Sequence, residues 1–520
     1  MPGKHSIMPR GLLAAGETPG LRGAKFGRLF PELPPGKYGT TEAAQSANLE
    51  ALATAMVAPF DKPKDSADDE ESGIPALYTY LGQFIDHDLT FDPNGSFAKQ
   101  KDPLAQVDFR TPAFDLDNLY GRGPGDQPYF YEEDGRTLRL GDPLTLGKPP
   151  GAHDLQRNSA GRALIGDPRN DENAIVSQLQ GLMTQFHNRL ATLHRHESFE
   201  HVQTLVRRHY QYVVINDFLP RIVHSSVLSD LKTGNSYDKS KIAFFNAFAG
   251  PLHLPYMPLE YSVAAYRIGH SMVRPGYRLN DATLLPIFPL PDVPPGFPEG
   301  LTGFRRMVSD WAIDWGRFID VDVRAYGTNA AVPTDAEALD NFKRLQFAYR
   351  IDTSLVDPLG SLPASVAEKP ASLALRNLMR SVQFGLPTGQ VVAARMNVAP
   401  LTDEEILIGQ GVDQPDPSLP NIATFAGGAF AGNCPLWVYI LAEAMKYRQT
   451  PVPNVPVAGN SPVAIGTPQL GPVGGRIVAE VFLGLLFSDQ ESYLNVAPDW
   501  TPPGGADFQL KHLVMAALEG

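Results

Sequence analysis

The stretch LGQFIDHDLTFDP, residues 81–93, places a histidine between two aspartates directly after an apolar segment. Apolar side chains recur at helical spacing through residues 76–89, so this segment is predicted to be a helix. Burying such a charged run costs solvation free energy unless its members find partners. The run is therefore a metal-ligand cluster, a solvated helix end, or a functional histidine whose two flanking acids have different roles.

The helical period divides this run between two faces of the predicted helix. Gln83, Asp86 and His87 occupy positions i, i+3 and i+4, which lie on one face. Asp88 is rotated about 100° away from His87 and points elsewhere. The stretch on its own leaves a solvated helix end open, because a histidine near a helix C-terminus interacts favourably with the helix dipole.

The composition limits the class of protein and its partners. The chain has 520 residues, of which 43% are hydrophobic and 19% are charged, as in proteins that bury a substantial core. Its 47 glycines and 48 prolines predict long, ordered loops. The net charge of −13 argues against nucleic-acid binding, because no basic surplus exists to neutralise phosphates. Cys434 is the single cysteine, so neither an intramolecular disulfide nor a thiolate metal cluster can form.

The sequence predicts neither a signal peptide nor a transmembrane segment. The apolar residues 12–15 are too few for the core of a signal peptide. The apolar stretches at residues 434–445 and 478–487 are too short to span a bilayer. We therefore expect a soluble protein, either cytoplasmic or exported by a leaderless route, and the sequence does not specify its oligomeric state.

The pattern of segments predicts a mainly α fold with little β structure, in which one large domain carries long ordered loops. Residues 1–75 are rich in Gly and Pro and are expected to form an extended arm with one short helix near residues 41–57. The main domain is expected over residues 76–520.

A broad apolar stripe over residues 173–196 predicts the strongest helix, with Asn170 or Asp171 as its cap. A short strand is expected near residues 391–395. Further helices are expected at residues 200–224, 260–274, 301–318, 335–348, 371–382, 403–411, 434–447 and 475–487.

The segment TPAFDLDNLYG, residues 111–121, carries oxygen donors at alternating positions. Carboxylates, backbone carbonyls and hydroxyls are the ligands that calcium takes. The same pattern is common in surface turns, so it indicates a calcium site only if the acid that follows His87 adds another carboxylate. The candidate ligands are Asp88, Thr111, the carbonyl of Ala113, Asp115 and Asp117.

The segment GDPRNDEN, residues 166–173, places Arg169 and Glu172 three positions apart at the start of the strongest predicted helix. A carboxylate is favoured there by the helix dipole. A capping acid beside a surface arginine accounts for this segment equally well when it is taken alone.

Each of two later segments places an arginine three positions away from a histidine or an asparagine. YRIGH pairs Arg267 with His270, and Gly269 between them allows another group to approach closely. LRNLMR pairs Asn377 with Arg380. A buried asparagine can orient an imidazole by accepting its second N–H, as it does beside metal sites. A lone histidine on a helix is nevertheless more often structural than a ligand.

Taken in order, these motifs resemble those of the animal-type haem peroxidases of the peroxidase–cyclooxygenase superfamily, which include myeloperoxidase and lactoperoxidase. GQFIDHDLTF is similar to the distal-helix motif of that family, RNDE to its R-x-x-E motif and YRIGH to its proximal histidine motif. NLMR with the later GLP is similar to its N-x-x-R motif and the turn that follows. The resemblance runs from about residue 76 to residue 490, and it implies that residues 76–520 form a haem peroxidase catalytic domain.

The resemblance implies a hydrogen-peroxide-dependent enzyme. His87 would take a proton from hydrogen peroxide and return it to the leaving oxygen. Arg169 would stabilise the charge that develops as the O–O bond breaks. The product would be a ferryl haem with a porphyrin radical, which would oxidise a halide, thiocyanate or a small aromatic donor. Gln83 matches the glutamine of the family's halide site.

The resemblance also implies how the cofactors are held. His270 would be the haem-iron ligand, with Asn377 on its second nitrogen. Asp86 and Glu172 match the two carboxylates that form ester bonds to the haem. Arg380 and Arg267 would pair with haem propionates or support the proximal segment, and Asp88, Thr111, Ala113, Asp115 and Asp117 match the calcium site.

The chain departs from the family pattern in three places. Asn173 stands where myeloperoxidase has the methionine of a third haem bond, so a lactoperoxidase-like pattern with two esters is expected. The family's R-D-H-G-L-P segment is QFGLP here, residues 383–387. The disulfides of mammalian members cannot form, so packing, proline and calcium must hold the loops.

The first alternative is a fatty-acid dioxygenase of the same superfamily. Cyclooxygenase-like members have a tyrosine three residues before the proximal histidine, where this chain has Arg267. Tyr266 would face to the side of that position, which disfavours the dioxygenase.

Two further alternatives belong to other classes of protein. A metal-dependent phosphohydrolase would use His87 and Asp88 as a metal-binding dyad and would recruit His187, His194 or His196. A calcium-stabilised adhesion protein would keep the fold without haem chemistry, and the intact histidines and arginine of the motifs disfavour it.

Overall fold

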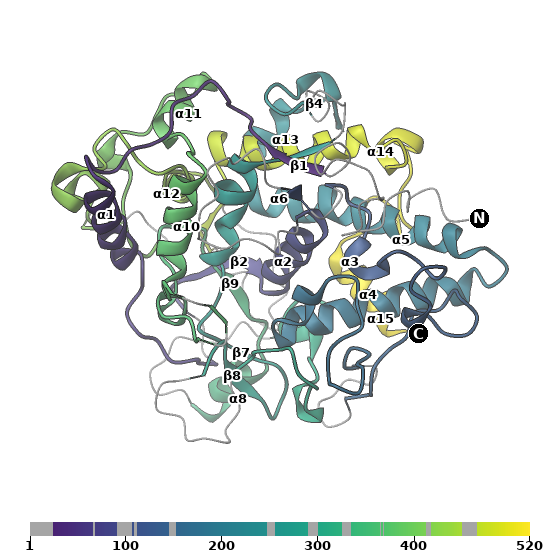
Figure 1. Cartoon of the computed structure of the whole chain (residues 1–520). Coiled ribbons are helices and arrows are strands. Elements are labelled where there is room, and N and C mark those ends of the chain that lie inside the picture. Colours follow the sequence, from purple (N-terminus) through teal and green to yellow (C-terminus); the bar gives the residue numbers. More distant parts are fainter. Residues whose placement is uncertain are drawn as a thin grey trace.

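The computed structural model describes residues 24–65, 68–90, 107–108, 112–144, 152–246, 255–289, 300–324, 334–364, 366–367, 369–411, 416, 418–449 and 465–519. Figure 1 shows that these residues are mainly helical, with a few short strands between the helices. The prediction of a mainly α fold with little β structure is confirmed.

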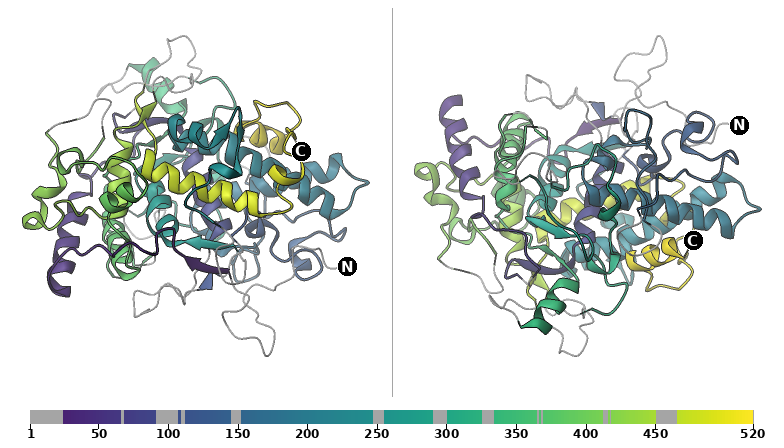
Figure 2. Two further views of the ribbon diagram at one scale, coloured as in Figure 1. Left: turned by 90° about the horizontal axis from the view of Figure 1, so that it is seen from above. Right: turned by 90° about the horizontal axis from the view of Figure 1, so that it is seen from below.

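Two helices in the C-terminal part of the chain lie at the centre of the core. α12 (Leu436–Ala444) is buried over its whole length, and α13 (Pro472–Ser488) is buried from Val473 to Leu486 apart from Arg476. Helices that are apolar on all sides are stable only inside a protein. The view from above in Figure 2 shows α13 crossing the middle of the molecule.

The other α-helices of the described residues are α1 (Glu42–Ala55), α2 (Leu77–Leu89), α3 (Asp117–Tyr120), α4 (Ala174–Leu193), α5 (Phe199–Val213), α6 (Leu219–Ile222), α7 (Ser225–Asp230), α8 (Asp335–Lys343), α9 (Asp357–Gly360), α10 (Leu373–Gln383), α11 (Gly389–Arg395), α14 (Tyr493–Val496) and α15 (Leu510–Leu518). Wider π-helical turns form η4 (Val214–Phe218) and η6 (Glu260–Ala264). Tighter 3₁₀ turns include η3 (Pro168–Asp171), η7 (Ala265–His270), η8 (Ser309–Trp311), η9 (Trp315–Arg317) and η10 (Asp403–Glu405).

The strands form small, separate sheets. β1 (Ala24–Gly27) pairs antiparallel with β3 (Val107–Asp108) and parallel with β6 (Tyr256–Pro258). The two-stranded antiparallel pairs are β2 (Glu71–Pro75) with β9 (Phe347–Tyr349), β4 (Lys232–Thr233) with β5 (Ser236–Tyr237), β7 (Gly276–Arg278) with β8 (Leu284–Pro286), and β10 (Arg448–Gln449) with β11 (Thr467–Pro468).

The segment predicted as an N-terminal arm is tied to the body of the protein wherever it is described. β1 belongs to the three-stranded sheet, and α1 contacts α10. The buried Glu260 carboxylate accepts hydrogen bonds from the backbone N–H groups of Leu29, at 2.9 Å, and Phe30, at 3.3 Å. The division of the chain at residue 75 stays a prediction.

The helix predicted over residues 260–274 is wrong in type and in length. The segment runs as the π turn η6 and then the 3₁₀ helix η7, which ends at His270. A helix cannot continue beyond it, because Arg274 forms a buried ion pair with Glu71 and the following residues pair as β7. Such departures from α geometry often mark functional sites.

The predictions for residues 301–318 and 403–411 are also wrong, because tertiary contacts occupy their backbone donors. Gly303 and Phe304 donate their N–H groups to the carbonyls of Glu172 and Asp171, so only η8 and η9 form nearby. Residues 403–411 contain η10 alone, since Ile408 donates to the carbonyl of Pro420.

Residues 391–395 are helical, in α11, rather than a strand. Their valines suit a strand, but α11 packs against α12, and tertiary packing overrides that weak preference. The predicted cap of the strongest helix is wrong as well. Asn173 caps α4 by accepting from Ile175 and Val176, because the residues before it form the separate turn η3.

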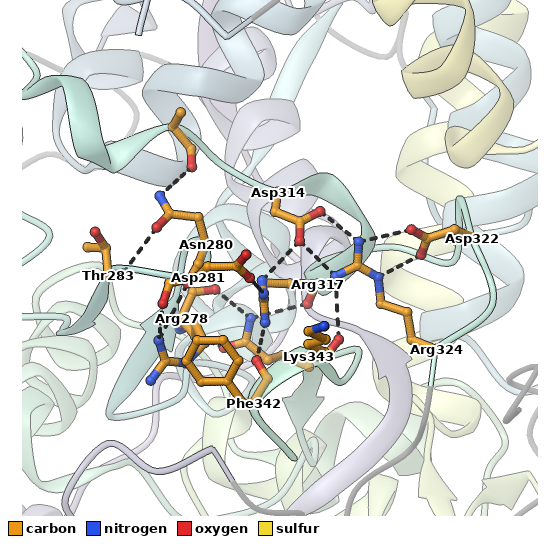
Figure 3. Close-up of polar contacts among 12 residues, drawn as sticks. Arg278, Asn280, Asp281, Thr283, Asp314, Arg317, Asp322, Arg324, Phe342 and Lys343 are labelled. Carbon is orange, nitrogen blue, oxygen red and sulfur yellow. Dashed lines mark hydrogen bonds and ion pairs between the residues drawn. The ribbon is translucent and has the colours of Figure 1, made fainter. Parts of the chain in front are cut away.

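A network of ion pairs fastens the loops around η9 (Figure 3). The buried Arg317 lies between Asp281 and Asp314, and Arg324 lies between Asp314 and Asp322. The Arg317 guanidinium also lies over the ring of Phe342, 5.4 Å from its centroid. In a chain that can form no intramolecular disulfide, this network joins loops that share little regular structure. None of the described helices combines the length and the apolarity that crossing a membrane requires.

Candidate active site

His87 lies near the C-terminal end of α2 with its imidazole buried. Its Nδ1 is 2.7 Å from Oδ1 of Asn170 in η3, and its Nε2 is 3.8 Å from Oε1 of Glu172. α2 contacts both η3 and α4, which explains why two segments far apart in sequence meet here. The structure thus brings the predicted His87 and Glu172 together, and it adds Asn170, which the sequence analysis treated only as a possible helix cap.

Gln83 lies one turn before His87 and joins the same group of side chains. Its amide donates to Oε1 of Glu172, and its Oε1 accepts from Nδ2 of Asn173 at 3.1 Å. The predicted sharing of one helix face by Gln83 and His87 agrees with these contacts.

Arg169 is held beside the C-terminal end of α2 by a buried acid. Its Nε is 3.1 Å from Oδ1 of Asp167, and its Nη2 is 2.9 Å from Oδ2 of that residue. Nη2 also donates to the carbonyl oxygens of His87, at 3.3 Å, and Thr90. Burial alone would lower the pKa of Arg169, but the charge and hydrogen bonds of Asp167, together with the charges of Asp86 and Glu172, outweigh it and raise the pKa. The guanidinium is therefore charged and fixed in orientation.

His270 ends the 3₁₀ helix η7 and meets an amide on α10. Its Nδ1 is 2.8 Å from Nδ2 of Asn377. Rotation of that amide by 180° exchanges its nitrogen and oxygen, so the same contact serves an Nδ1–H donor. Burial, with a further contribution from Arg267, lowers the pKa of His270 to about 3. The imidazole is therefore neutral, as metal ligation requires.

A cavity of about 280 Å³ lies between Arg169 and His270. Apolar side chains and guanidinium groups line it together, whereas no carboxylate does so among the described residues. The apolar side chains are Phe26, Leu259, Val263, Leu373 and Phe384, and the cations are Arg169, Arg267, Arg376 and Arg380. This lining suits a flat apolar group that carries negative charges at its edge.

The backbone beside His270 leaves room for such a group. A Cβ atom added to Gly269 would meet no atom within 4 Å. Arg380, one turn after Asn377 on α10, lines the same cavity, with its guanidinium 5.6 Å from the centroid of the Phe384 ring. The residues present therefore fit a haem, whose ring is apolar and whose two propionates are anionic.

Asp86 connects the helix of His87 with the segment of His270. Its Oδ1 accepts from Oγ1 of Thr90 at 3.2 Å, and its Oδ2 is 3.9 Å from Nη1 of Arg267. The Asp86 side chain is 17% exposed and that of Glu172 is 36% exposed, and Arg267, the ion-pair partner of Asp86, lines the cavity.

The candidate calcium ligands are only partly placed. Asp88 is fully buried, and its Oδ2 accepts from the backbone N–H of Leu116 at 3.3 Å. Leu116 has a left-handed φ of 57°, which turns its segment toward Asp88. Oδ1 of Asp115 accepts from the N–H of Asp117 at 3.1 Å.

Two of the candidate calcium residues contribute no side-chain evidence. The carbonyl of Ala113 belongs to the same loop as Asp115, and Thr111 lies outside the described residues. Within the ranges that the structure describes, no group of three or more His, Cys, Asp or Glu side chains is arranged to hold a metal ion. The calcium site stays a prediction.

His187 is placed unlike a metal ligand. Its Nδ1 is 3.0 Å from the hydroxyl of Tyr120, and its Nε2 is 2.7 Å from the carbonyl oxygen of Arg136. Burial lowers the pKa of His187 to about 4. Both ring nitrogens therefore have structural partners, which removes a ligand that a phosphohydrolase centre would need.

Comparison with known proteins gives one family-model match and several structures of the same fold. The family model of the animal haem peroxidases matches residues 94–289, a range that includes Arg169, Glu172 and His270. No curated protein matches the sequence.

Several solved structures share the fold over nearly the whole chain. Peroxidase A from Dictyostelium discoideum has a TM-score of 0.53 and 15% sequence identity, over 96% of this chain and 90% of that one. The fatty acid alpha-dioxygenase of Oryza sativa has a TM-score of 0.54 and 14% identity, covering 96% and 79%. The Arabidopsis thaliana fatty acid alpha-dioxygenase has a TM-score of 0.52 and 14% identity, covering 96% and 76%. At these identities the likeness establishes the fold alone.

Proposed function

We propose that this chain, which carries an animal haem peroxidase domain, uses hydrogen peroxide to oxidise small donors at a haem held in the arginine-lined cavity. One observation carries the proposal. Arg169, His270 and Asn377 come from three separate segments and line one cavity, and the Arg169 guanidinium also donates to the backbone carbonyl of His87 on α2. The donor is a halide, thiocyanate or a small aromatic compound.

The side of the cavity with His270 would hold the cofactor. His270 would ligate the haem iron through Nε2, with Asn377 accepting a hydrogen bond from Nδ1–H and so fixing the ring and raising its basicity. Arg267, Arg376 and Arg380 would face the propionates. When bound, the haem supplies the redox chemistry that no amino-acid side chain provides.

The side with His87 would manage the proton and the charge. Nε2 of His87 takes a proton from hydrogen peroxide and returns it to the departing oxygen, which leaves as water. The Arg169 guanidinium stabilises the negative charge that develops on oxygen during this exchange. Asp167 keeps that guanidinium in place, so little reorganisation is needed during the reaction.

The test of the proposed function is spectroscopic and kinetic. The purified protein, expressed with adequate haem, should show a Soret band and should oxidise iodide, bromide or guaiacol only when hydrogen peroxide is added. A protein that has no Soret band after haem supplementation would rule the function out.

A fatty-acid dioxygenase is the second candidate, because two of the fold neighbours are fatty acid alpha-dioxygenases. Against it, Tyr266 stacks on Tyr261 at a centroid distance of 4.8 Å and does not line the cavity. Oxygen uptake with palmitic acid in the absence of hydrogen peroxide would favour the dioxygenase over the peroxidase.

Ester bonds from Asp86 and Glu172 to the haem belong to the same proposal. Both carboxylates are partly exposed, and Asp86 lies 3.9 Å from the cavity-lining Arg267, so we expect acid–acetone to leave the haem on the protein. Asp86→Val combined with Glu172→Gln should make the haem extractable. The matched control is Asp126→Val with Glu133→Gln, two exposed acids that belong to none of the motifs. Haem that resists extraction from the double variant would show that these carboxylates form no esters.

A calcium ion bound by Asp88, Thr111, the Ala113 carbonyl, Asp115 and Asp117 would fix the C-terminal end of α2. An ion that binds only the folded state stabilises it by about 2.7 kcal/mol at a concentration 100 times its dissociation constant. Chelation with EGTA should therefore lower the melting temperature, and added calcium should restore it. If Asp88→Asn responds to EGTA as the wild-type protein does, the ion is not bound there.

A further inference from the structure

We propose that Asn170 is the positioning residue that holds His87 in the tautomer with a proton on Nδ1 and a free lone pair on Nε2. The inference rests on the proposed peroxidase function for its catalytic meaning. The structural evidence for it is the set of hydrogen bonds made by two buried side-chain amides, those of Asn170 and Gln180.

The contact between His87 and Asn170 is short and shielded from water. Oδ1 of Asn170 lies 2.7 Å from Nδ1 of His87, and Asn170 has no exposed surface. A carbonyl oxygen can only accept a hydrogen bond, so Nδ1 must be the donor. The second nitrogen, Nε2, then carries the lone pair that a general base needs.

A second buried residue fixes the direction of the Asn170 amide. Nδ2 of Asn170 donates to Oε1 of Gln180 on α4 at 2.8 Å, and Gln180 is 1% exposed. Turning the Asn170 amide over by itself would set its Oδ1 against Oε1 of Gln180 and leave both buried oxygens without a donor. The two amides are therefore coupled, and their arrangement in the structure gives Nδ1 of His87 the donor role.

The second ring nitrogen of His87, Nε2, is available to a small molecule. Oε1 of Glu172 is 3.8 Å from Nε2 of His87, which is beyond hydrogen-bonding distance, and it accepts instead from Gln83. Nε2 can thus accept a proton from a small molecule without first giving up a hydrogen bond to Glu172. The backbone also supports this arrangement, because the N–H of Asn170 donates to the carbonyl of Asp167 in the turn that presents Arg169.

Two substitutions of similar size separate a positioning role from a structural one. Asn170→Leu removes the acceptor for Nδ1–H, and Asn170→Asp keeps an acceptor but buries a charge. A residue that merely packs should tolerate Leu better than Asp, because an unpaired buried carboxylate is costly. A residue that orients His87 should show the reverse order.

The kinetic readout is the second-order rate constant for the reaction of the haem-loaded enzyme with hydrogen peroxide, measured by stopped flow. We expect Asn170→Leu to lower it about 10–100-fold, as for partners of this kind beside metal sites. Asn170→Asp should restore it to within about fivefold of the wild type, a difference of about 1 kcal/mol. Gln180→Met keeps Asn170 but removes its anchor, and should cause an intermediate loss even if Asn170→Leu fails to fold.

The tautomer itself is read independently of activity. In the full-length chain labelled with ¹⁵N-histidine and loaded with diamagnetic zinc protoporphyrin, the ring nitrogens of His87 should show the Nδ1–H pattern, with His87→Gln providing the assignment. An Nε2–H pattern, or an Asn170→Leu variant as fast as the wild type, or an Asn170→Asp variant as slow as Asn170→Leu, would overturn the inference. A wild-type protein with the Nδ1–H pattern but no reaction with hydrogen peroxide would refute the proposed function and leave the tautomer assignment standing.

Discussion

The two imidazoles beside the cavity have the same kind of partner in different surroundings. Nδ1 of His87 meets Asn170 at 2.7 Å, and Nδ1 of His270 meets Asn377 at 2.8 Å. His87 lies on helix α2. The neighbouring Gln83 forms hydrogen bonds with Glu172 and Asn173. His270 ends a 3₁₀ helix beside Arg267 and lines the cavity directly.

The difference shows that the histidine–asparagine pair does not define a role by itself. On the His87 side, Gln180 fixes the amide and Nε2 is left for proton transfer. On the His270 side, the cationic cavity and the lowered pKa keep the ring neutral, so that Nε2 can bind a metal. Under the proposed function, the same two residue types would serve acid–base chemistry in one place and ligation in the other.

The largest effect should come from removing the base. His87→Gln should lower the rate constant for reaction with hydrogen peroxide by about 10²–10⁴-fold, because positioned proton transfer contributes that much. Haem binding should persist, since His270 and Asn377 are untouched. Stopped-flow mixing with hydrogen peroxide measures the rate, and His196→Gln, at an exposed histidine, is the matched control. A loss of haem binding in His87→Gln would show that His87 and His270 do not have separate roles as base and haem ligand.

A smaller effect should follow from removing the amide on the other side. Asn377→Leu should weaken haem binding about 10–100-fold, as loss of a partner to a metal-ligating histidine usually does. The measurement is a haem titration in the Asp86→Val, Glu172→Gln background, where binding stays reversible. Unchanged affinity would mean that Asn377 only packs against His270.

The smallest effect should come from one added methyl group. Gly269→Ala should change the stability of the haem-free protein by no more than about 0.5 kcal/mol, because the new Cβ meets no atom within 4 Å. If haem fills that space, its affinity should fall by less than about tenfold, which corresponds to 1.4 kcal/mol. Gly125→Ala is the matched control, since its Cβ also meets nothing within 4 Å, whereas Gly269 is next to the cavity-lining His270 in sequence. Equal haem affinities for both variants would place the haem away from Gly269.

The regular helices and the motif residues were predictable because local patterns determine them. The period of α2 placed Gln83 and His87 together, and the spacing in α10 placed Asn377 and Arg380 one turn apart, where both line the cavity. The apolar stripe of α4 was equally clear. These predictions needed only the helical repeat and the order of the motifs.

The remaining features depend on contacts between distant segments. The π turn before His270 begins at Glu260, whose carboxylate accepts hydrogen bonds from residues more than 200 positions earlier in the chain. No local sequence pattern reveals such contacts. Gly303 and Phe304 donate their N–H groups to the carbonyls of Glu172 and Asp171, which are distant in sequence, and their segment does not form the predicted helix. The RNDE motif contains the polar Asn170, but the motif does not predict the partners of this residue, because His87 and Gln180 lie on two other helices.

The lining of the cavity also has a consequence for the order of events during synthesis. Its residues run from Phe26, in strand β1, to Phe384, just after α10. A ribosome must therefore deliver at least the first 384 residues before the walls can meet. Closing chain loops of that length costs entropy, so the cavity is expected to assemble late. Ligand binding would then follow the local folding of α2 and α4.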